Sequence, residues 1–595
     1  MDPFLTSVVS QSDLWMYASS RGGLAAGRRD SARSLFPYET VDKLHASQTH
    51  TGPTTVVRCE QDEQTYVWEP FSIDGRMRYE LERALYKHTL GCELWFEEHN
   101  ITLGLRFRYG WRPSSRFGWV RTCEFENTAG RKQMVEVLDG VQNLLPAGVS
   151  QGLQDSASCL VDAYKSAEYD PASGLALYSL TANIVDRAIA SEALSTTVAW
   201  RSGFDDADTL LDGTCREDFI RGRRVSPACD FNGRRGAYLL NGVIELAPEE
   251  NKWWHMVLDS PVDHVGLAQL RQRDLANTGT AVENDIREGH DTLRSLLAGS
   301  DALQLTGDEL ASAHHISNVL YNVARGGAPS DHYQLERDDF AGFLATRNRP
   351  VTRRNARWLR ELTDRVPHME LLGRADAVGD TDLLRLCYEY LPLVFSRRHG
   401  DPSRPWNQFT IVTENPDGST SYSYQGNWRD IFQNWEALAR SFPELLEPMI
   451  AKFVNATTVD GFNPYRITRD GIDWEISNPD DPWSSIGYWG DHQIVYLLKL
   501  IEASIAHHPG RLNKLLDRDL FSYADVPYDI KPYPDIVADP QNTIDFNRSR
   551  QRESEARVEQ IGTDGRLVHH HAGGVLLVNF TEKLLVPILS KLSNL

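Results

Sequence analysis

The most informative run of the sequence is Gly426-Asn427-Trp428-Arg429-Asp430-Ile431-Phe432-Gln433-Asn434-Trp435-Glu436. It holds two indoles, a guanidinium, two carboxylates and three side-chain amides. Indole faces cover the apolar C–H face of a pyranose, and Arg, Asp and amide groups satisfy its hydroxyls, which both donate and accept. The run therefore suits a site that holds a sugar. The alternative is a helix N-terminus with Asn427 as its cap and a charged first turn.

A second run, residues 480–492, comes directly before the apolar segment Gln493–Ile505. Its two glycines allow the backbone to approach a ligand, and Asp491 is expected at or near a helix start. A carboxyl in that place is usually only a charge partner of the helix N-terminus. Beside Tyr488 and Trp489 it could instead be a general acid, because partial burial against aromatic rings raises the pKa of a carboxyl toward the working pH.

Two further runs are rich in polar side chains. In residues 395–407, three arginines (Arg397 and Arg398 among them) and His399 surround a Gly-Asp-Pro turn. They could clamp an anion or several hydroxyls, or could simply be cations at the end of a helix. Residues 463–475 form a turn-rich stretch of carboxylates and aromatic side chains.

The histidines do not show the spacing of a metal site. The run 569–571 and the pairs 314/315 and 507/508 lack the i,i+4 spacing that places two imidazoles on one helix face. We therefore expect no metal and no cofactor. No P-loop, GxGxxG or GxSxG motif occurs, which removes the motif-based case for a nucleotide-binding protein or a serine hydrolase.

Composition narrows the class of protein further. A chain of 595 residues should divide into two or three domains. Its formal charge of −21 repels nucleic acid and anionic membranes, so neither is an expected partner. Seven scattered cysteines without a CxxC pair are typical of a reducing compartment. Since neither a signal peptide nor a long apolar stretch is visible, we expect a cytoplasmic protein.

The pattern of the chain changes once, near residue 262. Residues 1–262 consist of short alternating or β-branched runs between Gly, Asn, Asp and Pro, which predicts a large antiparallel β-sandwich. Residues 263–300 predict a helical linker, and residues 301–595 a helical domain. The long loops His399–Asn427 and Ala456–Ser485 join its helices and are a common place for a site.

The helical candidates differ in length and are separated by irregular stretches. They include Gly307–Ala324, Thr352–Arg365, Asp380–Ser396, Trp428–Arg440, Pro443–Val454, Ile486–His507, Arg511–Asp517 and Val575–Leu592. Asp525–Arg552 contains four prolines and is expected to be an irregular excursion. The chain thus has the pattern of an α+β multidomain protein in which helical hairpins follow a β-sandwich.

On two of these motifs the chain resembles the cellobiose and chitobiose phosphorylase family, once grouped as glycosyltransferase family 36 and similar to glycoside hydrolase family 94. Residues 428–434 are similar to its aromatic-Arg-Asp-x-x-Gln-Asp signature, which lines the subsite of the transferred glucosyl unit. Residues 487–492 resemble the segment that supplies the acid before a barrel helix. The resemblance implies an N-terminal β-sandwich, a helical linker and an (α/α)6 barrel.

The chain departs from the family at two positions and in length. Asn434 stands where the family usually has Asp, and Gly490 stands where it often has the first of two adjacent acids. Eight helical candidates follow residue 306, fewer than the twelve of six hairpins. We therefore expect an incomplete barrel, closed by a second copy of the chain or by a C-terminal partner segment.

The resemblance implies a carbohydrate-active enzyme of the six-hairpin glycosidase type that cleaves a β-linked gluco-oligosaccharide with inversion, using phosphate as co-substrate or water. Asp491 would be the acid. The expected substrate contacts are Trp428, Arg429, Asp430, Gln433, Asn434, Tyr488, Trp489, Arg397, Arg398 and His399. A hydrolase also needs a second carboxylate about 6.5–9.5 Å from the acid. Its candidates are Asp473, Glu475, Asp480 and Asp481. The alternative is a catalytically incomplete carbohydrate-binding or scaffold protein, as Asn434, Gly490 and the missing helices would favour.

Overall fold

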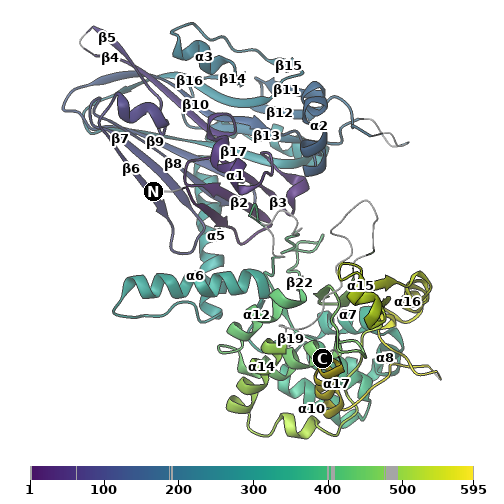
Figure 1. Cartoon of the computed structure of the whole chain (residues 1–595). Helices are drawn as coiled ribbons and strands as arrows, with labels where there is room; N and C mark the ends of the chain where they lie inside the picture. The colour runs from purple at the N-terminus through teal and green to yellow at the C-terminus, as the bar shows by residue number, and fades with distance from the viewer. Residues whose placement is uncertain are drawn as a thin grey trace. The chain divides into compact units, whose positions relative to one another are not determined.

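The computed structural model describes residues 3–61, 63–185, 188, 192–397, 401–403, 409–474, 476, 494–571 and 573–593, with the backbone alone at 429 and 590–593 (Figure 1). It divides into two compact units. The β unit comprises Met1–Ser295 and Gly400–Ile411, and the helical unit comprises Leu296–His399 and Val412–Leu595. The predicted mixed α+β class, with an N-terminal β-sandwich and a helical domain, is confirmed.

The β unit contains most of the strands. They are β1 (Leu5–Val9), β2 (Leu14–Ser19), β3 (Leu24–Arg28), β4 (Gly52–Gln61), β5 (Gln64–Trp68), β6 (Leu81–Lys87), β7 (Leu94–Asn100), β8 (Leu105–Ser114), β9 (Gly118–Asn127), β10 (Gln133–Leu144), β11 (Lys165–Asp170), β12 (Leu175–Leu180), β13 (Ser195–Ser202), β14 (Asp208–Asp212), β15 (Asp230–Asn232), β16 (Gly236–Leu246) and β17 (Asn251–Asp263). Its helices are α1 (Val41–Ala46), α2 (Gln151–Tyr164), α3 (Cys215–Ile220) and α4 (His264–Arg271), and α5 (Gly279–Gly299) crosses the division between the units.

Two antiparallel sheets form the sandwich and lie one over the other in Figure 1. The first has five strands in the order β14-β16-β10-β4-β5, and the second has nine in the order β15-β11-β12-β13-β17-β9-β8-β7-β6. Strands β1 to β3 make a separate three-stranded sheet. In the nine-stranded sheet most paired strands are also neighbours along the chain, as in β6 to β9 and β11 to β13, whereas in the five-stranded sheet only β4 and β5 are.

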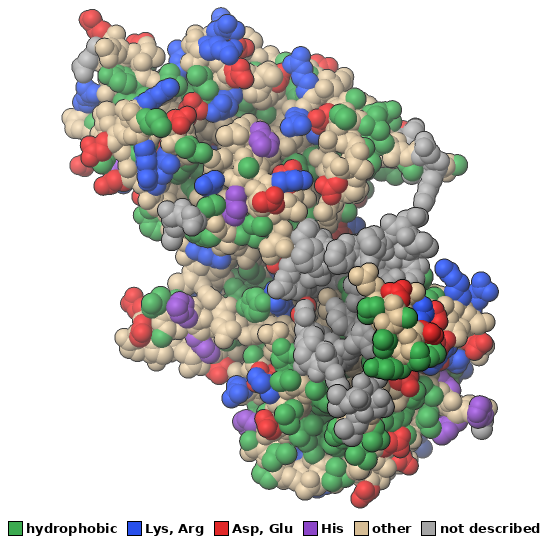
Figure 2. Space-filling model, in the orientation of Figure 1, with side chains coloured by type: hydrophobic (Ala, Val, Ile, Leu, Met, Phe, Trp, Pro, Cys, Tyr) green, Lys and Arg blue, Asp and Glu red, His purple; other side chains and the backbone are tan. Residues whose placement is uncertain are grey.

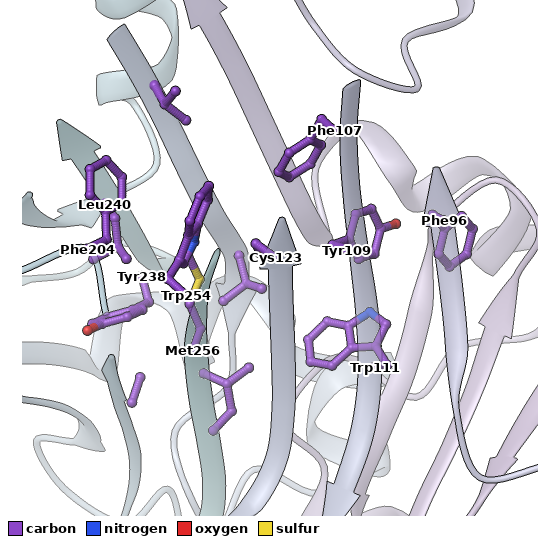
Figure 3. Packing of buried hydrophobic residues seen from close by; sticks show 14 of the residues in the cluster. Phe96, Phe107, Tyr109, Trp111, Cys123, Phe204, Tyr238, Leu240, Trp254 and Met256 are labelled. Carbon is purple, nitrogen blue, oxygen red and sulfur yellow. The ribbon is translucent and has the colours of Figure 1, made fainter. Parts of the chain in front are cut away.

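The core lies between the two large sheets. In β8, Leu105, Phe107, Tyr109 and Trp111 occupy alternate positions and are all buried, as the period of two requires. Figure 3 shows Phe107, Tyr109 and Trp111 side by side on one strand, with Trp254 and Met256 on another. Each such side chain contributes roughly 1.5–3 kcal/mol on burial.

One ion pair is completely buried in this core. Arg121 donates to both carboxylate oxygens of Asp139, each at 2.8 Å, and neither side chain is exposed. Asp139 also accepts from Thr55 (2.6 Å) and Trp254 (3.0 Å), and the guanidinium of Arg121 lies 4.6 Å from the ring centroid of Tyr109. Both oxygens of the carboxylate are thus satisfied by donors. A buried ion pair needs such additional hydrogen bonds to offset the cost of removing its charges from water.

The helical unit consists of helices joined by short strands. The helices are α6 (Glu309–Gly326), α7 (Arg337–Arg347), α8 (Arg349–Arg354), α9 (Ala356–Arg360), α10 (His368–Val378), α11 (Thr381–Glu389), α12 (Trp428–Leu438), α13 (Leu446–Asn455), α14 (Ile494–His507), α15 (Tyr533–Ala538), α16 (Arg548–Ile561) and α17 (Phe580–Ser593), with a 3-10 turn η7 (Thr563–Arg566). The strands are β18 (Ala328–Pro329), β19 (Gln334–Glu336), β20 (Arg365–Pro367), β21 (Leu393–Val394), β22 (Gln425–Asn427), β23 (Arg466–Thr468), β24 (Gly471–Asp473), β25 (Tyr528–Ile530) and β26 (Ile544–Phe546).

Packing partners fix the directions of three neighbouring helices. Trp428 at the start of α12 packs against Phe453 near the end of α13, with ring centroids 4.9 Å apart, so these helices are antiparallel. Ser504 near the end of α14 and His508 just beyond it bond to Glu447 at the start of α13, at 2.6 and 3.0 Å, so α13 and α14 are also antiparallel. Helices α12 and α14 therefore start at the same end of the unit.

The same end collects the ends of two other helices. Glu389, the last residue of α11, accepts a hydrogen bond at 2.8 Å from Asn455, the last residue of α13. We call this region, with the starts of α12 and α14 and the ends of α11 and α13, the polar end. The sheet β22-β23-β24 lies here too, because β22 runs directly into α12.

Several local expectations need correction. The stretch Thr352–Arg365 is not one helix: α8 and α9 divide at Asn355, whose φ of −101° and ψ of 11° interrupt the helix. The proline-containing stretch Asp525–Arg552 is not irregular throughout, because Asn547 caps α16 by accepting from the N–H of Arg550. The strongly polar sequence of α16 has no apolar period, which is why the pattern of the sequence does not reveal it.

The surface carries charges of both signs. On the face drawn in Figure 2, basic and acidic side chains are interspersed over the β unit. Exposed ion pairs such as Arg223–Asp218, at 3.0 Å, belong to this surface. Within the described ranges, no helix is both long enough and apolar enough to cross a bilayer.

The Asp139→Asn substitution should destabilise the β unit by about 3–5 kcal/mol, because it leaves Arg121 buried without its counter-charge. Urea unfolding followed by tryptophan fluorescence measures this loss. As a control, Asp218→Asn removes a surface pair with Arg223 and should change the free energy of unfolding by at most about 1 kcal/mol. Equal effects of the two substitutions would contradict the role given to the buried pair.

Candidate functional site

The start of α12 is anchored in the core by its aromatic side chains. Trp428 is fully buried, and its ring packs edge-on against Phe432 and Phe453. Trp435 is also buried, and its indole N–H donates to the carbonyl of Gly326 at 2.8 Å. Positions 428, 432 and 435 follow the i, i+4, i+7 period of one helix face. The indole of Trp428, predicted to hold a sugar, is thus occupied by core packing.

The polar residues of the run lie on other faces of α12. Asp430 is 8% exposed and Asn434 2%, and the side-chain amide of Asn434 donates to the carbonyl of Asp430 at 2.5 Å. Gln433 is exposed. Asn427 is the N-cap by position, yet its side chain makes no capping hydrogen bond. Of the predicted substrate contacts on this helix, the described ones are therefore split between the core and the surface.

Several predicted site residues fall outside the described residues. These are the acid Asp491, the aromatic residues Tyr488 and Trp489, the cationic residues Arg398 and His399, and the carboxylates Glu475, Asp480 and Asp481; at Arg429 only the backbone is described. Arg397 is described: its backbone N–H donates to the carbonyl of Ala324 at 2.6 Å, and its guanidinium lies 5.0 Å from the ring centroid of Phe395.

A closed ring of four charged side chains is buried beside the polar end. Arg347 donates to Glu389 (2.7 Å) and Asp564 (2.9 Å), and Arg385 donates to the second oxygen of each, at 2.9 and 2.5 Å. All four side chains are at most 4% exposed. Burial alone would raise the pKa of Glu389, but the charges of Arg347 and Arg385 outweigh it and hold that pKa at about 2. The ring thus keeps both carboxylates ionised.

Lys452 of α13 adds a fifth charge next to this ring. Its ammonium donates to the carbonyl of Arg469 at 3.0 Å and lies 5.6 Å from the ring centroid of Tyr424. Burial, and then the charge of Arg347, lower the pKa of Lys452 to about 7, although Glu389 opposes the shift. A buried lysine that titrates near neutral pH is a candidate functional residue.

A second polar cluster was not foreseen from the sequence. Asp339, in the first turn of α7, accepts from the hydroxyl of Tyr390 at 2.5 Å and from Arg469 at 2.6 Å. Burial raises the pKa of Asp339, against the opposing charge of Arg469. Its side chain remains 19% exposed, so it is partly accessible to solvent. No motif surrounds Asp339 in the sequence, and its partners lie 51 and 130 residues away.

Asp473, one candidate for the second carboxylate, is tied to its own loop. It pairs with Arg466 across β23 and β24 and with Arg566 at 3.4 Å. Its carboxylate also accepts from the N–H of Trp474 at 3.0 Å. The two arginines link β24 to β23 and to η7, so in the described structure Asp473 has a structural role.

The β unit contains a cavity of about 370 Å³ with a mixed lining. Phe71 and Tyr109 contribute aromatic surface, while Arg21, Glu69 and Thr54 contribute polar groups. Arg216, also in the lining, pairs with Glu69 and donates to Thr54 at 3.1 Å. The volume lies in the range of small-molecule sites, about 300–1,000 Å³.

One protein-family model matches part of the chain. Residues 330–392 match the model of glycoside hydrolase family 149 insertion domain 1. The segment runs from just after β18 to just before β21 and includes Asp339, Arg347, Arg385, Glu389 and Tyr390. Over this segment, the match supports the predicted distant relationship to glycoside hydrolases and phosphorylases. No curated protein matches the chain.

Individual solved structures are only remotely similar. A protein described as a kojibiose phosphorylase, from the human microbiome, is 10% identical at a TM-score of 0.32, covering 65% of this chain and 48% of its own. A bacterial glucoamylase complexed with acarbose is 10% identical at a TM-score of 0.32, covering 87% and 80%. A galactose mutarotase-like protein from Lactobacillus casei is 8% identical at 0.23, covering 43% and 99%. The chain thus spans about half of the phosphorylase, and likeness at this level supports no argument about activity.

The titration of Lys452 gives a test by pH. Its pKa is lowered in the folded state, so the folded state gives up this proton near pH 7 and the unfolded state only near 10.5. Between these values the unfolded state binds more protons, and stability must rise with pH. The free energy of unfolding of the wild type should therefore rise relative to that of Lys452→Met, by at most about 1.4 kcal/mol per pH unit. Urea titrations across this interval measure it, with the exposed Lys514→Met as control; parallel profiles would contradict the assignment.

Proposed function

We propose that this chain is a glycoside phosphorylase or hydrolase that acts with inversion on a β-linked gluco-oligosaccharide at the polar end of the helical unit. The observation that carries the proposal is that α12 and α14 start at the same end. The two sequence motifs that resemble the phosphorylase family are attached to these two starts. Residues 428–434 form the first two turns of α12, and Asp491 precedes Ile494, the first residue of α14, by three positions.

Chain length supports the pairing of the two motifs. Asp491 lies three positions before Ile494 in the sequence, and three residues of chain reach about 10 Å at most. Asp430 lies in the first turn of α12. A sugar held near Asp430 would then have Asp491 as its proton donor. The partial positive charge of two neighbouring helix starts also favours an anionic co-substrate such as phosphate.

The reaction then needs two events at the polar end. A carboxylic acid protonates the oxygen of the leaving sugar, and phosphate or an activated water attacks the anomeric carbon from the opposite face. With a β-linked donor, inversion by phosphate yields an α-configured sugar phosphate. Asp491 is the proposed acid, while Asp430 and Arg429 are the proposed contacts to the sugar hydroxyls.

Asp339 is the alternative acid. Its raised pKa and partial exposure suit a proton donor, and it lies in the segment that matches the glycoside hydrolase family 149 domain. Its ion pair with Arg469 favours the ionised form instead. A direct comparison of Asp339→Asn with Asp491→Asn separates the two assignments.

Phosphate consumption and reducing-sugar release from a panel of glucosyl disaccharides would test the activity. Asp491→Asn should lower kcat/KM by about 10²–10⁴-fold, the usual contribution of a general acid. Asp339→Asn should retain most of the wild-type kcat/KM. For the wild type, NMR of the first-formed product should show the α anomer. Full activity of Asp491→Asn with a large loss in Asp339→Asn would move the acid to Asp339. Retention of the β configuration would overturn inversion.

A second candidate function is carbohydrate binding without turnover, and the cavity in the β unit favours it. Aromatic rings beside ion-paired and hydroxyl groups suit a sugar. In this case gluco-oligosaccharides should bind by calorimetry although no substrate turns over. Arg216→Ala, which removes the guanidinium from the cavity lining, should weaken binding by about tenfold or more. Arg223→Ala on the surface is the matched control, and unchanged affinity in Arg216→Ala would remove the cavity as the site.

A further inference from the structure

Three side chains with metal-binding atoms converge in the β unit, outside the sites described above. They are His88, Cys92 and His290, and one ligand atom from each lies within 4.8 Å of the other two. Nδ1 of His88 is 3.5 Å from Sγ of Cys92. A tetrahedral zinc ion with Zn–N and Zn–S bonds of about 2.0–2.1 and 2.3 Å holds these two atoms about 3.5 Å apart. The observed distance between Nδ1 of His88 and Sγ of Cys92 therefore equals the distance expected between two ligands of one zinc ion.

The backbone holds two of these side chains in one tight turn. Residues 88–93 connect β6 and β7, where the N–H of His88 donates to the carbonyl of Glu93 at 3.1 Å and that of Gly91 to the carbonyl of His88 at 2.8 Å. Gly91 has a φ of 72°, which glycine adopts without strain. The turn brings His88 and Cys92 together although they are four residues apart.

The third side chain comes from α5, which is fixed on the nine-stranded sheet. Arg112 of β8 pairs with Glu283 of α5, and Ser114 donates to Asp285 at 2.5 Å. These contacts bring His290, further along α5, to the turn, where its ring lies 5.2 Å from that of His88. The cluster is therefore assembled from two elements that are each anchored independently.

We propose that His88, Cys92 and His290 bind one divalent transition-metal ion, with zinc as the ion that two imidazoles and one thiolate fit best. A water completes the coordination, and Glu93 lies beside the site as an outer partner. Oε1 of Glu93 lies 3.3 Å from Nε2 of His290, and Arg112 (2.9 Å) and Trp95 (2.8 Å) hold this carboxylate in place. A carboxylate beside a ligating imidazole fixes its orientation and raises its basicity.

Metal binding would remove one proton, from Cys92, and one hydrogen bond, from Leu90 to His88. Cys92 is 1% exposed, and burial raises the pKa of its thiol to about 12, so without a metal it is not a reactive thiol. The metal displaces this proton to solvent and takes the Nδ1 lone pair of His88, which otherwise accepts the N–H of Leu90 at 3.1 Å. Arg112, a cation on the neighbouring strand β8, is paired with both Glu93 and Glu283. The bound ion would link the β6–β7 turn to α5.

Zinc titration of the full chain tests the proposal. Protein stripped with a chelator and titrated with Zn²⁺ against a chromophoric chelator should bind one equivalent tightly. Cys92→Ser and His290→Asn should each weaken it by more than about 100-fold, beyond the 10–100-fold cost of losing an outer partner of a metal. Cys229→Ser removes an exposed thiol outside the cluster and should leave the affinity unchanged.

Cobalt substitution separates ligation from folding. Co²⁺ bound at this site should show a thiolate-to-cobalt absorption band in the wild type and in Cys229→Ser, and the band should be absent in Cys92→Ser. Thermal unfolding of each metal-free variant checks that it folds, and Zn²⁺ should raise the Tm of the wild type but not of Cys92→Ser. Binding of equal strength in Cys92→Ser, or cobalt bound without the thiolate band, would overturn the site.

Discussion

The helical unit depends on the buried ring of Arg347, Glu389, Arg385 and Asp564. Removing four charges from water costs several kcal/mol for each ion, and only a geometry in which every charge meets two partners offsets that cost. In the ring each carboxylate is bonded by both guanidinium groups. Since α7, α11 and η7 each supply a part, the three segments must come together at one place, although Asp564 lies 217 residues beyond Arg347.

The position of the ring explains the character of the polar end. Glu389 accepts a hydrogen bond from the side chain of Asn455, so the ring holds the end of α13. Helix α13 in turn contacts the start of α12 through Phe453 and the end of α14 through Glu447. Burial, and then the charge of Arg347, lower the pKa of the neighbouring Lys452 to about 7. The charges that stabilise this part of the fold thus lie at the end of the helical unit where we propose the reaction.

The β unit also contains a buried ion pair, with two charged side chains instead of four. Arg121 and Asp139 form an ion pair inside the sandwich core, in place of apolar packing. Both oxygens of the buried carboxylate accept hydrogen bonds, from Arg121, Thr55 and Trp254. Around it, alternate residues of β8 and its neighbours fill the space between the sheets. The polar contacts that hold α5 on the nine-stranded sheet also bring His290 close to His88 and Cys92.

The sequence by itself determined the elements whose signal is local. The period of two in β8 and the period of 3.6 in α12 follow from single segments, so the sandwich, the helical unit and the start of α12 at Trp428 were predictable. Only the tertiary structure decided what those side chains do. Trp428 has the chemistry of a sugar-binding indole, but the position of Phe453 makes it part of the core. The charge ring, the Asp339 cluster and the three possible metal ligands depend on contacts between distant segments. Such contacts are set by the total burial and charge balance of the fold, and no short stretch of sequence records them.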